Sequence, residues 1–219
     1  MDKKKPIKFK IKPKPKPIKF VPRKNDKLAI RILNIDPTSK FLKATTISLK
    51  DRGYGNDIKL VKGIIRKEQT SKRVMDGWKQ WFSNNNNINK IISEGKDLLI
   101  MEDDVIVKSN YTKLIKKIKK NKINFIFYQK TFKEKGKDIP VGTQGLIIPN
   151  ALIKFYQKEL LDAKSIHFDR WNSRLPNIHY ACLPKECGEE ITRVSATTGK
   201  IRKGRQLKES DLVSKIDKS

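Results

Sequence analysis

Three consecutive carboxylates, Glu102, Asp103 and Asp104, are the residues whose types and spacing most directly suggest chemistry. They follow the apolar run Leu-Leu-Ile-Met at 98–101 and precede Val-Ile-Val at 105–107. A short apolar run of this length predicts a strand that is buried on both faces of a sheet. Carboxylates at the end of such a strand are costly to bury unless a positive charge lies among them. The pattern therefore favours a divalent cation held by hard oxygen ligands, with substrate phosphates completing its coordination.

The geometry of this acidic cluster depends on where the strand ends. If the strand continues, Glu102 and Asp104 share one face and Asp103 points to the other. If a turn begins at Glu102, all three carboxylates can converge. In open α/β sheets ligands bind at the carboxyl ends of the strands, which is where the sequence places the cluster. A metal there would stabilise a leaving nucleoside diphosphate as a Lewis acid. The alternative is a solvated acidic loop between Met101 and Val105.

Strand-like and helix-like patterns alternate around the cluster. Short runs rich in β-branched residues predict strands or hairpins, and apolar residues at helical spacing predict helices. Expected strands cover 28–35, 44–49, 58–65, 97–107, 123–128, 141–148 and 179–183. Expected helices cover 70–82, 88–93, 111–120 and 150–161, with a loop or short helix at 166–175 and turn chemistry at 83–87. This alternation predicts one α/β domain with a mostly parallel sheet flanked by helices.

The composition divides the chain of 219 residues into three parts. Residues 1–26 form a Lys- and Pro-rich arm that we expect to be disordered, because repelling lysines and dense prolines cannot build a core. Residues 27–198 are expected to form the folded domain, and 199–219 a basic polar tail. The arm could bind a polyanion electrostatically, or it could be a solubilising segment without a partner.

The formal net charge of +28 predicts attraction to polyanions such as nucleic acid, anionic membranes or acidic glycans. Lysine, isoleucine and asparagine usage is also typical of an AT-rich genome, which alone could explain much of the excess. No apolar run approaches the ~20 residues of a membrane helix, and no signal peptide is evident. Cys182 and Cys187 are expected to be reduced thiols rather than a local disulfide. These features favour a soluble cytoplasmic or virion-packaged protein.

The segment from Leu98 to Val107, which contains Glu-Asp-Asp, resembles glycosyltransferase family 25. That family includes lipopolysaccharide-synthesis and collagen galactosyltransferase-type enzymes with a GT-A fold. Three further segments are similar to the family's motifs and follow in the expected order: Ala44–Arg52, the opening strand; Gly142–Pro149, the Gly-Thr strand; and His167–Asp169, the later acidic loop. The resemblance covers roughly residues 44–200.

The resemblance implies a GT-A-like, Rossmann-related fold. It also implies a metal-dependent transfer of a hexose from a nucleoside-diphosphate sugar, with a UDP-sugar favoured, to a hydroxyl of a glycan or protein acceptor. Residue by residue, it implies nucleotide contacts by Ser48 and Arg52, a sugar site shaped by Gly142 and Thr143, and Mn²⁺ or Mg²⁺ held by Glu102, Asp103 and Asp104. Asp169 would be the base or acceptor-hydroxyl anchor, or else a helix N-cap or turn residue.

Several other interpretations stay open. His167 and His179 are expected to be structural or surface residues, and Trp78 and Trp81 to pack in the core. Trp171 could pack in the core or stack on an acceptor sugar. The rival functions are a non-catalytic basic virion or nucleic-acid-binding protein, a two-metal nuclease or nucleotidyltransferase, and an inactive relative that serves as an interaction module.

Overall fold

The structure, a computed structural model, describes residues 27–34, 39, 41–64, 72–165, 167–182 and 184–190. The predicted arm and tail, 1–26 and 199–219, lie outside these residues. The strands are β1 (Leu28–Asn34), β2 (Asp57–Lys62), β3 (Asp97–Glu102), β4 (Val105–Val107), β5 (Ile123–Glu134), β6 (Lys137–Ile148), β7 (Ile178–Tyr180) and β8 (Gly188–Glu190). The helices are α1 (Phe41–Asp51), α2 (Lys72–Ser83), α3 (Asn85–Ser93), α4 (Tyr111–Ile115), the 3₁₀ turn η1 (Asn150–Leu152), α5 (Ile153–Asp162), α6 (Phe168–Asn172) and α7 (Pro184–Cys187).

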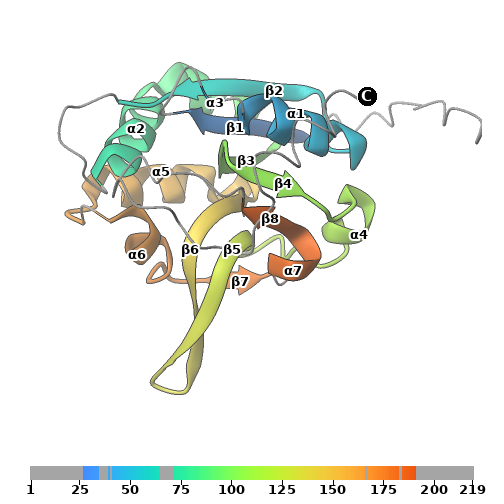
Figure 1. The fold of residues 1–219 in the computed structure, drawn as a ribbon. Helices are drawn as coiled ribbons and strands as arrows, with labels where there is room; N and C mark the ends of the chain where they lie inside the picture. The colour runs from blue at the N-terminus through green and yellow to red at the C-terminus, as the bar shows by residue number, and fades with distance from the viewer. Residues whose placement is uncertain are drawn as a thin grey trace, which may run out of the picture.

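Six strands form the central sheet, in the order β2-β1-β3-β6-β5-β7 (Figure 1). Strand β1 runs parallel to β2 and β3, and β5 runs parallel to β7. Strand β6 is antiparallel to both of its neighbours. Every strand except β6 therefore points the same way, and the carboxyl ends of β1, β2 and β3 meet at one edge. The predicted α/β class and mostly parallel sheet are confirmed, and the arrangement is consistent with a GT-A-like fold.

Two apolar cores cover the two faces of this sheet. One core packs α2, α3, α5 and α6 against residues such as Leu33, Ile100 and Leu146. The other packs α1, α4 and the β4–β8 ribbon against residues such as Ile32 and Met101. Strands β1 and β3 are buried along both faces, which explains why they read as continuous apolar runs in the sequence.

The segment at 44–49 is a correction to the sequence analysis, because it lies within helix α1 and is not a strand. Its β-branched residues suggested a strand, but Thr45 and Leu49, which are buried, are spaced four residues apart. That spacing puts both on one side of a helix. The opening strand of the sheet is instead β1, which lies before the matched segment.

Several other boundaries also differ from expectation. Strands β5 and β6 are longer than predicted and form a hairpin that projects from the body of the molecule (Figure 1). Helix α4 ends at Ile115, five residues before the predicted end. The asparagines after Ser83 begin α3 instead of forming a turn, because Asn84 caps the helix by accepting hydrogen bonds from the N–H groups of Asn86 and Asn87.

Cys182 and Cys187 form a disulfide with a Cα–Cα distance of 6.1 Å, so the expectation of reduced thiols was wrong. The chain between β7 and β8 folds back through α7, which brings the two residues together. The Cys187 carbonyl also accepts hydrogen bonds from the N–H groups of Lys108 and Ser109, at 2.7 and 3.0 Å. This corner therefore fixes the end of β4. Within the described ranges, no helix is long and apolar enough to cross a membrane.

Candidate functional site

The acidic cluster lies where β3 leaves the sheet. Strand β3 ends at Glu102, Asp103 and Asp104 form a turn, and the chain continues as β4. Of the two geometries left open by the sequence, the structure therefore has the turn. The residues Asp103 and Asp104 are only 2% and 0% exposed, and Glu102 is half-buried. Two buried carboxylate-bearing residues thus lie side by side at the carboxyl edge of the sheet. This placement excludes the solvated acidic loop.

Helix α1 holds this acidic turn (Glu102–Asp104) in place through two side chains one turn apart. The Thr45 hydroxyl donates to the carbonyl oxygen of Asp103 at 2.8 Å. The Ser48 hydroxyl accepts from the N–H of Val107 at 2.9 Å and donates to the carbonyl of Thr45 at 2.8 Å. Ser48, which the resemblance assigned to the nucleotide, is thus seen here fixing β4.

Arg52 follows the last residue of α1, and its side chain is exposed. The Arg52 carbonyl accepts a hydrogen bond from the N–H of Tyr111 at 3.0 Å. Because a helix rises 1.5 Å per residue, Arg52 lies about 10 Å farther along α1 than Thr45 does. The main chain of Arg52 therefore faces α4, whereas Thr45 faces the acidic turn.

The other predicted site residues meet on the far side of β3. The N–H of Thr143 on β6 donates to Oδ1 of Asp169 at 3.2 Å. Asp169 is the second residue of α6, and His167 occupies the N-cap position. Gly142 has φ +72°, and a Cβ at this position would lie 2.6 Å from Cγ of Gln129. Glycine therefore allows β6 to bend immediately before the contact with Asp169.

The strand registers place these two groups at the same edge of the sheet. Met101 pairs with Gly145, the last pair between β3 and β6, and Thr143 lies two residues beyond it on β6, toward the edge at which β3 ends. On the other side Leu33 pairs with Glu102, which brings Asn34 beside the turn. Neighbouring strands are about 4.8 Å apart. The neighbouring strands β1, β3 and β6 therefore carry Asn34, the acidic turn and Thr143 toward the same edge, and Asp169 of α6 contacts Thr143.

Two buried oxygens flank the acidic turn. Oδ1 of Asn34 and Oγ1 of Thr143 are buried and make no hydrogen bond with the part of the chain that the structure describes. Unsatisfied buried polar atoms are uncommon and call for a ligand, ion or water. Amide and hydroxyl oxygens are also hard ligands of the kind that Mg²⁺ and Mn²⁺ accept.

A divalent cation at the acidic turn would have to share its coordination with a substrate. Among the described residues, no group of three or more His, Cys, Asp or Glu side chains is placed so that it could hold a metal ion by itself. Mg²⁺ in phosphate-transfer sites is commonly held by one or two carboxylates together with substrate phosphates, and it needs no complete cage. The acidic turn can supply those carboxylates.

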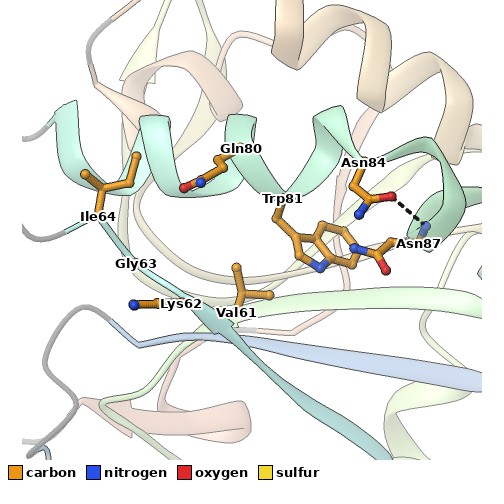
Figure 2. Close-up of a pocket in the computed structure, with 8 residues that line it drawn as sticks. All are labelled: Val61, Lys62, Gly63, Ile64, Gln80, Trp81, Asn84 and Asn87. Carbon is orange, nitrogen blue, oxygen red and sulfur yellow. Dashed lines mark hydrogen bonds between the residues drawn. The ribbon is translucent and has the colours of Figure 1, made fainter.

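An open groove of about 620 Å³ lies at the β2 end of the same sheet. Figure 2 shows Trp81 reaching from α2 toward β2, with Asn84 and Asn87 beside it. The wall of the groove also includes Gln80, Lys62 and Gly63. The Arg31 guanidinium lies 6.0 Å from the centre of the Trp81 ring. The groove combines an aromatic ring with several amide side chains, which suits a flat polar ligand.

Trp78 packs in the core, and Trp81 and Trp171 pack against it. Trp78 is fully buried, whereas Trp81 is half-buried at the groove. Trp171 packs its ring 5.4 Å from that of Tyr156 and 6.2 Å from that of Phe168, which favours the core interpretation. Burial lowers the pKa of His179, and the nearby Lys119 and Lys122 lower it further although the Lys117 carbonyl raises it.

Sequence reasoning missed Asn34, Thr45 and the groove. Asn34 ends an apolar strand, and a polar residue there is a signal that could have been used. Thr45 looked like an ordinary β-branched strand residue. The groove joins β2 to the junction of α2 and α3, so no local pattern reveals it.

No family model and no curated protein matches this chain. One similar solved structure is described as a "crystal structure of a glycosyltransferase involved in the glycosylation of the major capsid of PBCV-1". The two chains are 12% identical and superpose with a TM-score of 0.45, over 70% of this chain and 81% of the other.

Proposed function

We propose that this protein is a metal-dependent glycosyltransferase that moves a hexose from a nucleoside-diphosphate sugar to an acceptor hydroxyl. One observation carries the proposal: the acidic turn and the Thr143–Asp169 contact lie on adjoining strands at the carboxyl edge of the sheet. The first group suits a metal-bound diphosphate, and the second places a carboxylate close to where the sugar would lie.

The nucleoside-diphosphate sugar would lie along the carboxyl edge of the sheet. Its diphosphate would lie at the acidic turn, where Glu102, Asp103 and Asp104 would hold Mn²⁺ or Mg²⁺. Lys62 of β2 pairs with Asn34 of β1, and two strand spacings, about 10 Å, separate β2 from β3. That separation suits a nucleoside in the groove. There Trp81 would stack on the base while Asn84, Asn87 or Gln80 provides hydrogen bonds. We favour a UDP-sugar as the donor.

The chain's own residues then perform the transfer. The bound metal would supply Lewis-acid stabilisation of the departing diphosphate. Asp169, held in position by the Thr143 N–H, takes the proton from the acceptor hydroxyl as that oxygen bonds to the anomeric carbon. The bond from the anomeric carbon to the diphosphate breaks, and the nucleoside diphosphate leaves with the electron pair. Gly142 lets the backbone approach the sugar closely.

The test is the thermal stability of the full chain with Mn²⁺ and UDP. A ligand that binds only the native state stabilises it by RT ln(1 + [L]/Kd), about 2.7 kcal/mol at a hundredfold excess over Kd. We expect this stabilisation in the wild type and its loss in the double variant Asp103→Asn/Asp104→Asn. The matched control is Asp51→Asn/Asp162→Asn, which alters two exposed carboxylates on α1 and α5.

A positive result leads to an assay for donor hydrolysis with UDP-glucose and UDP-galactose. If Mn²⁺ and UDP stabilise the wild type and the double variant equally, the acidic turn does not bind the metal. A folded wild type that is not stabilised by UDP, GDP or CDP with metal would rule out the transferase. It would favour the non-catalytic polyanion-binding function that the charge of +28 suggests.

A further inference from the structure

A second cleft lies at the opposite end of the sheet from the Trp81 groove. It has a volume of about 650 Å³ and runs between the β5–β6 hairpin, the loop after α6, and β7. The Tyr180 hydroxyl of β7 donates a hydrogen bond to the main-chain oxygen of Asp138 in the hairpin. The hairpin is thereby held as one wall of the cleft. Lys122, immediately before β5, and Arg174, after α6, also line the cleft.

The residues that line this cleft carry more positive than negative charge. Its two carboxylates both belong to the hairpin and are matched there by lysines. Asp138 forms an ion pair with Lys133 at 3.1 Å, and Glu134 lies directly opposite Lys137 in the strand register. Lys122 and Arg174 make no ion pair within the described part of the chain. The cleft therefore contains two cations that no carboxylate of the described residues pairs with.

The cleft and the proposed site of transfer share strand β6. Ile139 lines the cleft and Thr143, which contacts Asp169, lies four residues farther along the same strand. At 3.3 Å per residue this is about 13 Å. An acceptor whose hydroxyl is at Asp169 would extend along β6 into the cleft. In the cleft it would meet Arg174, whose planar fork binds carboxylates and phosphates in a bidentate manner, and Tyr180, whose ring can stack on a sugar.

We propose that this cleft, with Lys122 and Arg174 as its anion-binding groups, binds an acidic saccharide that forms part of the acceptor. The identification of this saccharide as an acceptor rests on the proposed glycosyltransferase function. Its binding in the cleft requires neither nucleotide nor metal. A neutral glycan would leave the two cations unused, and the aromatic and hydrogen-bonding wall suits a sugar chain better than a bare phosphate.

The experiment measures binding of a short oligogalacturonate, which is a carboxylated saccharide, to the full chain at physiological salt. Neutral dextran of the same length and a single-stranded oligodeoxynucleotide of the same charge serve as comparison probes. The cleft variant is Lys122→Gln/Arg174→Gln. The matched control is Lys59→Gln/Lys90→Gln, which removes the same charge from exposed residues of β2 and α3 at the far end of the sheet.

We expect the cleft variant to bind oligogalacturonate about tenfold or more weakly, the loss of roughly one charge-assisted hydrogen bond. The control variant should lose less than about threefold, because scattered surface charges contribute little individually. Equal losses in both variants would overturn the proposal in favour of diffuse attraction. An oligonucleotide that binds more tightly and shows the same loss would overturn the choice of a saccharide.

The two proposals can fail separately. Stabilisation by Mn²⁺ and UDP is measured on the same cleft variant, where we expect it to be unchanged and thereby to show that the variant is folded. A wild type that lacks the UDP effect, but whose oligogalacturonate binding depends on Lys122 and Arg174, would refute the transferase and keep the cleft. The opposite pattern would keep the transferase and refute the cleft. Lys122→Ala/Arg174→Ala provides a second variant should the first prove unstable.

Discussion

At Asp169 one substitution can test the proposed catalytic role without disturbing the fold. Its Oδ1 atom accepts a hydrogen bond from the main chain of Thr143, and an asparagine oxygen can accept the same bond. The Asp169 side chain is only half-buried, so the amide can be accommodated. The structural and chemical roles of this carboxylate can therefore be tested with one nearly isosteric change.

We predict that Asp169→Asn lowers kcat about 10²- to 10⁴-fold while leaving KM for the donor nearly unchanged, because the amide cannot take the acceptor proton. Thermal stability should change little. Steady-state kinetics with a UDP-sugar and an acceptor, beside a melting curve, provide the measurement. Activity within a few-fold of the wild type would mean that Asp169 only positions the strand.

At the scale of elements, helix α1 determines where the acidic turn lies. A turn between two short strands is easily displaced, and α1 bonds to the main chain on both sides of this one, through Thr45 to Asp103 and through Ser48 to Val107. Thr45 is fully buried and donates to the main chain of the turn. The helix is therefore part of the site although it presents no carboxylate to it.

We predict that Thr45→Val destabilises the protein by about 1–3 kcal/mol, because it leaves the buried Asp103 carbonyl without this donor. The same change should weaken the stabilisation by Mn²⁺ and UDP. Thr46→Val is the matched control: Thr46 is half-buried and adjacent in sequence, and its effect should be within about 0.5 kcal/mol. Chemical denaturation with and without ligand measures both effects. If the two valine variants behave alike, the hydroxyl of Thr45 is not what holds the turn.

At the scale of the whole molecule, an ion cluster ties together the first three parallel strands. Asp57, at the start of β2, pairs with Arg31 of β1 and with Lys96 just before β3, each at 3.1 Å. Arg31 is nearly fully buried, whereas Asp57 keeps about a fifth of its side chain exposed. Burial alone would raise the pKa of the Asp57 carboxyl, but Arg31 and Lys96 outweigh it and lower that pKa.

We predict that Asp57→Asn costs about 1–3 kcal/mol at neutral pH. This is less than the 3–5 kcal/mol of a fully buried pair, because solvent screens Asp57. A carboxyl with a lowered folded-state pKa contributes stability above its unfolded value, about 3.9, and loses it as pH falls through the folded-state pKa. The difference between wild type and variant should therefore be constant above pH ~5 and shrink in stronger acid. Urea denaturation across this range measures it, and a difference that is unchanged at pH 2 would contradict the ionic origin.

Four places form a series across the sheet. The groove beside β2, the acidic turn after β3, the Thr143–Asp169 contact on β6 and the cleft beside β7 follow the strand order. In the proposed function the donor would occupy the first part of this series and the acceptor the last. The single reversed strand, β6, is what connects the two halves, because it carries both Thr143 and the wall of the acceptor cleft.

The sequence by itself determined the features that depend on local patterns. Apolar runs identified β1 and β3, helical spacing identified α2, and the three carboxylates marked the end of a buried strand. These could be predicted because the periods of strands and helices are visible over a few residues. The same locality misled the analysis at Ala44–Leu49, where β-branched residues occupy a helix that packs on β4.

Only the tertiary structure decided how distant residues meet. It brought Thr45 to Asp103 and Thr143 to Asp169, joined Cys182 to Cys187, and enclosed the groove and the cleft. Each of these depends on strand order, on register and on the single antiparallel strand. Such pairings are selected by the burial of the whole core and leave no pattern in a short segment. The residue types that could do chemistry were therefore readable from the sequence, but their assembly along one edge of the sheet was not.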